Sequence, residues 1–303
     1  MMNRPTALSH GAMLLFSALV AGSFSLGHMI ANEITPAALT ALRFVIAAAI
    51  LGVLVWRTCG VSRDDLVAPW RYLLLGGLMG TYFILMFEGL KTASAVSTSA
   101  VFTLTPALSA VFGYILLSQL VTSRIVVALG IGVVGALWVI FRADFNLILA
   151  LDIGRGEGIY FLGCVAHAVY TPLVRKLNRG QSPVVLTFGT ILGALVLALV
   201  YGFGDLMSID YEGLRPIVWG TLIYLGVFAS AMSFLLIQYS TLHLPSSKVM
   251  AYTYLTPSWV ILWEFALRHP LPPLMVWLGV VATILALCLL LRDESSRQQD
   301  RIC

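Results

Sequence analysis

Charged side chains are scarce in this sequence of 303 residues. Asp, Glu, Lys and Arg make up 11% of the chain and hydrophobic residues make up 59%, whereas about a quarter of the residues of a soluble domain are charged. This composition excludes an ordinary soluble globular domain. The net charge of +4 is therefore no sign of nucleic-acid binding, because the chain is predicted to lie in a lipid bilayer.

Cysteines are also few, and none of them is placed for chemistry. Cys59, Cys164, Cys288 and Cys303 lie far apart, and no two of them form a CxxC motif. A disulfide framework or a thiolate metal site needs paired or closely spaced cysteines. We therefore predict no disulfide, no bound metal and no cofactor.

The motifs of membrane enzymes are missing or incomplete. The chain contains neither HExxH nor GxSxG, and GFGD at 202–205 resembles only half of the aspartyl protease site. That chemistry needs a second aspartate within reach, and no other predicted span contains one. We predict that the chain is not an enzyme, and a membrane-embedded or lipid-modifying enzyme remains the alternative from another class.

Long apolar segments recur along the whole chain. A helix needs about 20 mostly apolar residues to cross a bilayer, and ten segments are suitable. The first is longer than the signal-peptide core of about 7 to 15 residues, so we interpret it as a retained helix. The predicted spans of this all-α membrane protein are 11–31, 37–56, 70–89, 95–117, 124–141, 156–174, 183–204, 216–239, 246–267 and 273–291.

Lysine and arginine are distributed unevenly between the two predicted faces. The face of the N-terminus receives Arg4, Arg57, Arg63, Arg71, Arg124, Arg175, Lys176, Arg179, Lys248, Arg292, Arg297 and Arg301. The other face receives Lys91, Arg142, Arg155, Arg215 and Arg268. Because positively charged loops remain cytoplasmic, we predict a multi-pass protein of a bacterial-type inner membrane with both termini in the cytoplasm.

Two pairs of similar segments indicate an internal repeat. TLTPALSAVF and YLTPSWVILW place Pro106 and Pro257 at an offset of 151, and TPAALTALRF and SPVVLTFGTI match at an offset of 147. Each copy contains five spans, so the second copy is predicted to be inverted in the membrane, as in many secondary transporters. The predicted units are 1–150, 151–291 and a cytoplasmic tail, 292–303.

The two prolines are predicted to lie near the middle of their spans. Each removes a backbone donor and clashes with the carbonyl four residues earlier, so Phe102 and Thr253 lose carbonyl partners. A kink of this kind is tolerated where nearby hydroxyls or cavity water replace the lost bond. Packing alone is the alternative, but two matching kinks favour a shared cavity.

Short motifs carry a resemblance to a known family. ALRF at 41–44, GLKTASA at 89–95 and the TLTP and YLTP segments, in ten spans, resemble the EamA-type transporters of the drug/metabolite transporter superfamily. The resemblance implies efflux of a small organic metabolite, and an uptake carrier of the same fold is an alternative. The chain departs from the family pattern at Gln119 and His269, where a glutamate is usual, and near Ala21 and His167, where a tryptophan is often present.

Ionisable residues at membrane depth are costly and mark candidate sites. Arg43 is suited to a substrate carboxylate, but we favour a structural role in which Glu88 or helix-end carbonyls satisfy it. His167, with Tyr170 one turn later, is a candidate for solute binding or proton coupling, and a bond to a neighbouring helix is an equal alternative. Glu88 is a second candidate for proton coupling, although Glu88 and Glu264 also fit as interfacial residues.

A central cavity is predicted between the repeat starts and the proline segments. Its cargo is expected to be neutral, amino-acid-like or amphipathic, because few charges face it. The partners are this solute and the lipid bilayer, without nucleic acid; the oligomeric state is open, and a homodimer is one arrangement. The predicted cavity residues are Ser23, Arg43, Tyr82, Thr105, Pro106, His167, Tyr170, Tyr252, Thr256, Pro257 and Trp259.

GIGVVG at 130–135 matches the dinucleotide-binding pattern GxGxxG only as a string. That site needs a preceding strand and an aqueous phosphate, whereas this segment lies inside an apolar span. Small residues let helices approach closely in lipid. We interpret the segment as a packing surface, together with Gly76, Gly77 and Gly80.

Overall fold

The computed structural model describes residues 4–150 and 153–299, and within these ranges every regular element is a helix. This agrees with the predicted all-α class. The elements are α1 (Arg4–Ile30), α2 (Pro36–Thr58), η1 (Asp64–Leu66), α3 (Trp70–Leu90), α4 (Ala95–Phe102), α5 (Thr105–Leu117), α6 (Ser123–Ile140), α7 (Phe145–Ala150), α8 (Arg155–Leu177), α9 (Pro183–Ser208), α10 (Pro216–Gly226), the π-helix η2 (Val227–Met232), α11 (Ser233–His243), α12 (Ser246–Ala251), η3 (Tyr252–Leu255), α13 (Thr256–Ala266) and α14 (Val276–Gln299).

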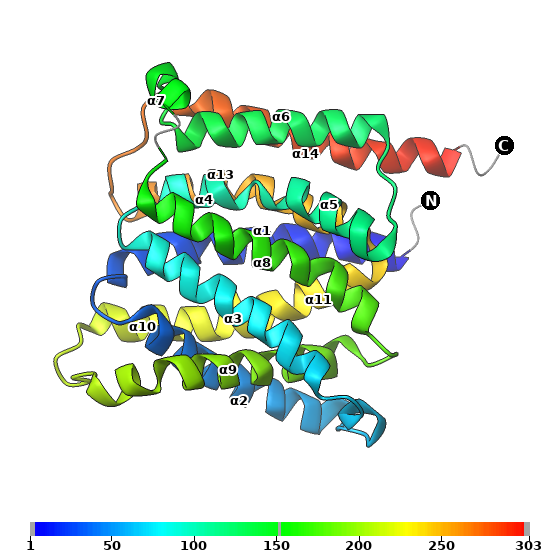
Figure 1. Ribbon diagram of the computed structural model, residues 1–303, viewed down its shortest axis with the longest axis vertical. Coiled ribbons are helices and arrows are strands. Elements are labelled where there is room, and N and C mark those ends of the chain that lie inside the picture. The colour runs from blue at the N-terminus through cyan, green and yellow to red at the C-terminus, as the bar shows by residue number, and fades with distance from the viewer. Residues whose placement is uncertain (1–3, 151–152, 300–303) are drawn as a thin grey trace.

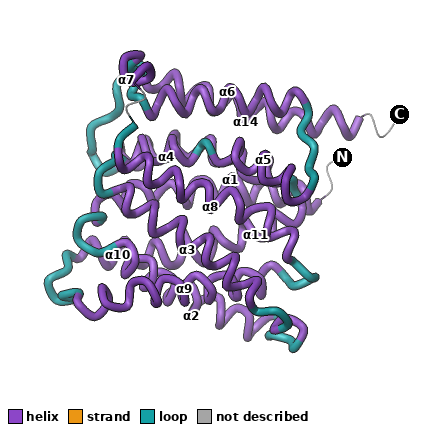
Figure 2. The backbone as a smooth tube through the Cα atoms, viewed as in Figure 1, coloured by secondary structure: helices purple, strands orange, loops and turns teal. Residues whose placement is uncertain are grey.

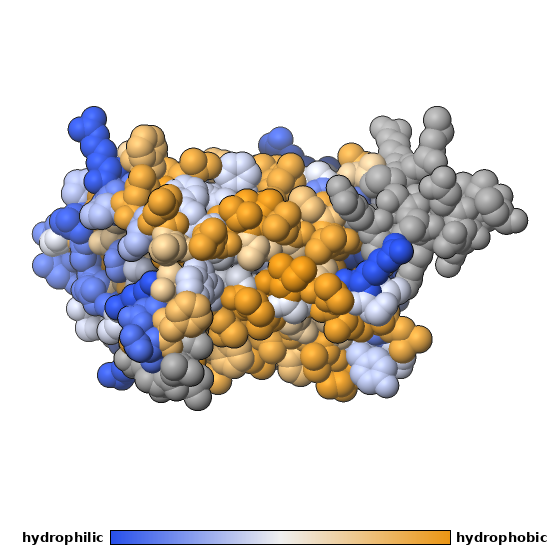
Figure 3. Space-filling model, turned by 90° about the horizontal axis from the view of Figure 1, so that it is seen from above, coloured by the Kyte–Doolittle hydropathy of each residue, from blue (hydrophilic) through white to orange (hydrophobic). Residues whose placement is uncertain are grey.

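The long helices lie side by side along one common direction (Figure 1). Their connections gather at the two ends of this array (Figure 2). The start of α1 and the end of α14 lie at the same end, which we call the termini face, and α7 lies at the other end, the opposite face. Hydrophobic residues cover the middle of the surface seen in Figure 3, and hydrophilic residues gather at the opposite face. This distribution suits a bilayer core between two aqueous layers.

Seven helices in the described part of the chain are long and apolar enough to cross a membrane. Three other predicted spans are helical but fall outside this set: α8, the interrupted α12 to α13, and the short apolar part of α14, Val276–Leu291. The number of ten crossings therefore remains a prediction. The last helix continues to Gln299 through most of the predicted tail, and residues 300–303 lie outside the described residues.

The matched segments at Thr35 and Ser182 begin two helices in the same way. The Thr35 hydroxyl accepts a hydrogen bond from the N–H of Ala38 at 3.4 Å, and the Ser182 hydroxyl accepts one from Val185 at 3.3 Å. A proline follows each cap, at a helix position where its missing N–H costs nothing. The similar sequences therefore produce equivalent starts of α2 and α9, which pack against each other.

Regular α-helical hydrogen bonding is interrupted by a short turn at each central proline, while the backbone of the flanking residues stays in the right-handed helical region. Pro106 lies in the first turn of α5, which a short turn separates from α4, and Pro257 lies in the first turn of α13, after η3. A proline is readily accommodated in a first turn because its N–H is not needed there. The predicted loss of regular α-helical hydrogen bonding at both prolines is therefore confirmed.

The two breaks differ in their hydrogen bonds. Thr103 and Thr253 each donate a hydroxyl hydrogen bond to the carbonyl three residues earlier, at 2.7 Å. In the first break the Thr105 hydroxyl also donates to the Phe102 carbonyl, which confirms that a threonine compensates for the proline. In the second break the Thr256 hydroxyl is buried without a partner. The Thr253 carbonyl there accepts the backbone N–H of Thr256 instead.

Most of the helix packing joins the first half of the chain to the second. The contact of α3 with α8 has a counterpart in the contact of α11 with α1. The contact of α5 with α8 has a counterpart in the contact of α13 with α1. Likewise α5 contacts α12 and α4 contacts α13, while α6 packs on α14. The apolar core is therefore shared between the halves, and neither half buries its apolar surface alone.

Glycines bring two helix pairs into backbone contact. A Cβ atom on Gly76 would lie 2.2 Å from the backbone nitrogen of Ala194 on α9, and one on Gly135 would lie 2.8 Å from the carbonyl oxygen of Gly279 on α14. By contrast, a Cβ atom on Gly130 would have no such neighbour within 4 Å. The packing interpretation of GIGVVG is therefore confirmed at Gly135 and wrong at Gly130.

An ion pair joins two loops on the opposite face. The Arg215 guanidinium donates to both carboxylate oxygens of Glu33, with its Nε atom 3.0 Å from each. This hydrogen bonding by Arg215 holds the pKa of Glu33 below its usual range. The stabilisation is therefore fully present above the unfolded carboxyl pKa of about 4.3 and is lost as the pH falls through the lowered folded-state pKa.

Glu33→Gln is expected to lower the melting temperature near neutral pH and to lose this effect in acid. The substitution removes a charge that is already neutralised when the wild-type carboxyl becomes protonated. We would measure both melting temperatures in detergent between about pH 7 and about pH 3. A difference that stays constant over this range would contradict the role of the pair.

Candidate functional site

Tyr82, His167 and Tyr170 form a buried cluster where α3 meets α8. The ring centres of Tyr82 and His167 lie 4.6 Å apart, and those of His167 and Tyr170 lie 6.0 Å apart. The Tyr82 hydroxyl is 2.9 Å from the hydroxyl of Tyr160. The fold thus brings together three of the predicted cavity residues, Tyr82 from the first half of the chain and His167 and Tyr170 from the second.

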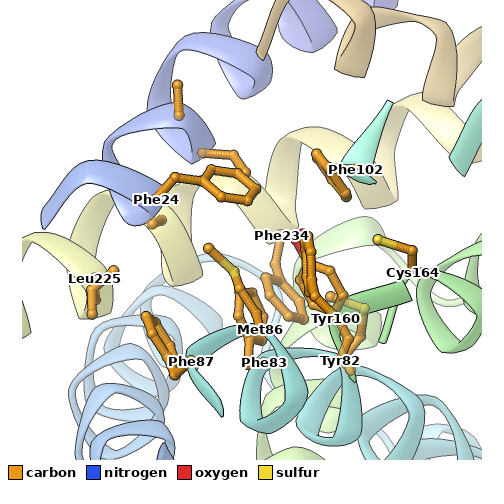
Figure 4. Packing of buried hydrophobic residues seen from close by; sticks show 14 of the residues in the cluster. Phe24, Tyr82, Phe83, Met86, Phe87, Phe102, Tyr160, Cys164, Leu225 and Phe234 are labelled. Atoms are coloured by element: carbon orange, nitrogen blue, oxygen red, sulfur yellow. Dashed lines mark hydrogen bonds between the residues drawn. The ribbon is translucent and has the colours of Figure 1, made fainter. Parts of the chain in front are cut away.

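An aromatic layer borders this cluster on the side of α1. Phe24 on α1 packs against Phe102 at the end of α4, with ring centres 5.8 Å apart, and against Tyr160 at 5.9 Å. Figure 4 shows these rings converging with Tyr82 from different helices. Aromatic contacts of this kind are favourable in edge-to-face or offset arrangements. Phe24, Phe102 and Tyr160 lie nearer the opposite face than His167 and Tyr170 along their helices.

Several buried polar atoms around the two helix breaks lack a hydrogen-bond partner. Among them are the His167 Nδ1 atom and the hydroxyls of Tyr170, Ser23 and Thr256, and the hydroxyls of Tyr254 and Ser258 at the second break are unpartnered as well. His167 and Tyr170 lie on α8, which packs on α5, whereas Ser23 lies on α1, which packs on α13. An unsatisfied buried polar group costs about 1 to 3 kcal/mol, so a polar solute or water would be bound favourably there.

Arg43 is buried in α2 and is held by the α10–α11 segment, not by Glu88. Its Nε atom donates to the Ser230 hydroxyl at 2.8 Å, and its Nη2 atom donates to the Ala229 carbonyl at 2.7 Å. Both acceptors lie in η2, whose π-helical turn alters the usual backbone bonding. The guanidinium carbon also lies 3.9 Å from the ring centre of Phe83. The contacts fit the structural role: of the two expected kinds of partner, Glu88 was wrong, and backbone carbonyls near the end of α10 accept from Arg43.

Glu88 lies near the end of α3 at the opposite face. Its carboxylate forms an ion pair with Lys91 at 2.7 Å, and its side chain is 40% exposed. This position agrees with an interfacial residue. It does not join Glu88 to the Tyr82–His167 cluster, so its role in proton coupling remains a prediction.

Tyr252 and Trp259 contact α1 on the termini side of the aromatic layer. The Tyr252 hydroxyl lies 2.8 Å from His10 Nδ1, and the Trp259 indole donates to the Ser17 hydroxyl at 3.2 Å.

The two positions that depart from the resembled family make different contacts. Gln119 Oε1 accepts the backbone N–H of Ser246 at 3.2 Å and thereby joins the end of α5 to the start of α12 on the termini face. His269 Nδ1 instead lies 2.9 Å from Glu264 Oε2 on the opposite face. Gln119 therefore joins two helices, whereas the contact of His269 is local to the end of α13.

Sequence analysis missed several residues that complete the site. Tyr160 and Phe102 extend the aromatic cluster, and Ser230 binds Arg43. Glu157 is buried in α8 and accepts the Ser97 hydroxyl at 2.7 Å. Glu157 was recognisable as a carboxylate inside a predicted apolar span. The role of Ser230 had no comparable signal, because it depends on the π-helical turn.

Comparison with known proteins gives consistent matches. The EamA-like transporter family matches the chain twice, at residues 8–141 and 154–292. The uncharacterized transporter YyaM of Bacillus subtilis is 27% identical over 277 residues, which cover 90% of each chain. The uncharacterized transporter sll0355 of Synechocystis sp. is 29% identical over 150 residues, 48% of this chain and 44% of that protein. A crystal structure of a protein with 19% identity has the same fold, with a TM-score of 0.70 over 94% of this chain and 96% of that one.

Proposed function

The chain belongs to the EamA-like transporter family and is a multi-pass membrane transporter, and on this basis we propose that it exports a small organic solute by alternating access. In this proposal ten spans form two inverted repeats in a bacterial-type inner membrane, with both termini cytoplasmic. The solute binds at the centre of the bundle. One set of helices then rocks against the other to open this site to either face.

The helix packing supports an inverted repeat. Equivalent pairs occur throughout, such as α3 on α8 with α11 on α1, and the two family matches fall one in each half. The capped starts of α2 and α9 are also alike. A two-fold relation in the membrane plane accounts for these paired contacts, because it exchanges each element with its counterpart in the other half.

The unpartnered polar atoms beside the helix breaks are the observation that carries the proposal. His167, Tyr170, Ser23 and Thr256 provide hydrogen-bonding atoms in an otherwise apolar core. Each break also divides a span into two short helices, which can change their relative angle more easily than one continuous helix. Solute recognition and movement are therefore proposed to meet at the same place.

The cargo is proposed to be neutral, zwitterionic or amphipathic. The cluster offers hydroxyl and imidazole groups, and the nearby Arg43 retains one buried nitrogen, Nη1, without a partner. His167 is the better-placed proton-coupling candidate because it lies inside the cluster, whereas Glu88 is paired at the surface. An uptake carrier with the same site is the second candidate, and the direction of solute accumulation distinguishes the two.

Tyr170→Phe is expected to reduce transport without reducing the amount of folded protein. The substitution removes a hydroxyl that has no protein partner, so stability should be unaffected, whereas a bond to the solute would be lost. We would profile metabolites in the medium of expressing cells and then measure uptake into liposomes. The expected rise in KM is roughly fivefold to tenfold.

Tyr254→Phe provides the matched control. The Tyr254 hydroxyl is also buried and unpartnered, but its ring packs beside Gly132 on α6, away from the central cluster. This variant should transport like the wild type. Export is contradicted if the wild-type chain changes no solute in the medium, and the central site is contradicted if both tyrosine variants behave alike.

A further inference from the structure

A second site lies at the opposite face, outside the proposed central cluster. A pocket of about 270 Å³ is bordered by the ends of α1, α6 and α13 and by the start of α4. This volume is near the lower end of the range of about 300 to 1,000 Å³ that is typical of small-molecule sites. The polar residues that matter here are His28, Ser97, Arg142 and Glu264.

Glu264 is the most unusual group of this pocket. The residue is only 8% exposed, and one carboxylate oxygen, Oε2, is paired with His269. The other oxygen, Oε1, is buried without any hydrogen-bond partner. A buried carboxylate oxygen without a donor is costly, so a ligand that brings a donor would be bound favourably after a small rotation of the carboxyl group.

The neighbouring polar groups also present acceptors to the pocket. His28 Nδ1 lies 3.0 Å from the Leu90 carbonyl, and because a carbonyl only accepts, Nδ1 must carry the proton. The Nε2 atom of the neutral ring is then an acceptor. The Ser97 hydroxyl donates its proton to Glu157, so its oxygen lone pairs remain to accept. Three side chains from three helices therefore favour a donor-rich, positively charged group.

Arg142 supplies the opposite charge at the edge of the same pocket. Its side chain is exposed at the end of α6, and its backbone adopts a left-handed conformation with φ of 55°. The guanidinium is suited to a carboxylate on the same ligand. Glu264 is buried whereas Arg142 is exposed, so the carboxylate is expected to contribute more to ligand binding than the guanidinium. The pocket is therefore suited first of all to a positively charged group.

The pocket is separated from the central cluster by the aromatic layer. Phe24 lies four residues before His28 on α1, about 6 Å deeper at 1.5 Å per residue. Phe102 lies five residues beyond Ser97 on α4, and these two rings are in contact. The pocket thus lies nearer the opposite face than the central cluster, with the Phe24–Phe102 contact between the two.

We infer that this pocket binds the protonated amino group of a solute, with Glu264 as its counter-ion and His28 and Ser97 as further acceptors. The inference rests on the proposed transport function, because it assigns the pocket to solute entering or leaving the central site. The ammonium group belongs either to a simple amine or to an amino acid. In the second case Arg142 binds the carboxylate.

Binding to the purified full chain in detergent tests the inference. Leucine, isoamylamine and isocaproate share one hydrocarbon skeleton. Leucine carries both an ammonium and a carboxylate group, isoamylamine carries only the ammonium group, and isocaproate carries only the carboxylate group. Calorimetry is expected to detect the first two and not the third. Glu264→Gln should raise the Kd of both leucine and isoamylamine by roughly tenfold or more, since a charge-assisted bond is lost. The matched control Glu212→Gln, an exposed carboxylate on the same face, should bind like the wild type.

The arms of the experiment separate the ligand sources. If leucine binds more tightly than isoamylamine, and Arg142→Gln removes this difference, the site is supported and is assigned to an amino acid. If leucine and isoamylamine bind equally, the site is supported and is assigned to an amine. The inference is overturned if Glu264→Gln binds the amine as tightly as the wild type does, if isocaproate binds as tightly as isoamylamine, or if the wild type binds no amine. If the amine binds through Glu264 but is not transported into liposomes, the proposed function alone is overturned. If Glu264→Gln transports the amine with an unchanged KM, this inference alone is overturned.

Discussion

Gly76→Val is expected to yield little folded protein, whereas Gly77→Val, one residue further along α3, is expected to fold. A Cβ atom at position 76 would lie 2.2 Å from the Ala194 nitrogen and 2.5 Å from the Thr190 carbonyl oxygen. Both are backbone atoms of α9, which cannot rotate aside as a side chain can. The helices must separate, and we expect the free energy of unfolding to fall by about 3 kcal/mol or more.

Gly77 makes this comparison specific. No atom outside its own helix lies within 4 Å of a Cβ atom at position 77, and both variants lose the same backbone freedom of glycine. Folded protein would be measured by size-exclusion chromatography in detergent, and stability by unfolding in denaturing detergent. Similar losses in the two variants would show that the α3–α9 contact is not the cause.

Arg43→Met is expected to lower the free energy of unfolding by about 3 kcal/mol, because it leaves buried acceptors in η2 without their charged donor. Methionine replaces much of the volume but provides neither the bond to Ser230 nor the one to Ala229. Lysine should restore little, since it lacks the planar fork of donors. Hydrogen exchange within Val227–Met232 should also accelerate, because its π-helical turn loses this support.

Arg57→Met is the control for the loss of an arginine from α2. Arg57 is exposed near the end of the same helix and has no comparable buried acceptors. We expect its unfolding and its exchange in η2 to match those of the wild type. If Arg43→Met also matched the wild type, the bonds to η2 would have no structural importance.

The membrane helices were predictable from the sequence because composition alone decides which segments can lie in hydrocarbon. The repeat around Pro106 and Pro257 likewise located both interruptions, since a proline cannot continue normal helix bonding. Whether each helix bends or breaks depends on one or two threonine bonds and on neighbouring helices. The sequence pattern does not contain that information.

The candidate site was only partly predictable for a similar reason. Tyr82, His167 and Tyr170 were recognisable as polar groups at unusual depth, and the structure brings them together. The partners of Arg43 depend on a π-helical turn almost 190 residues later in the chain, as the separation of 187 to Ser230 shows. Contacts of this range follow from tertiary packing, so sequence analysis proposed Glu88 or helix-end carbonyls and did not identify Ser230.

In the proposed alternating-access cycle, the bond from Ser246 to Gln119 has a consequence for how often the protein opens to each side. Two identical inverted halves would make the two access states equal in energy, so any preference must come from positions where the halves differ. The termini face has this bond between α5 and α12, whereas His269 at the matching position of the second half pairs with Glu264. A bond of about 1 kcal/mol that forms in one state alone would bias the resting populations about fivefold. The same solute would then show a different apparent affinity on each side of the membrane, although its binding site is shared.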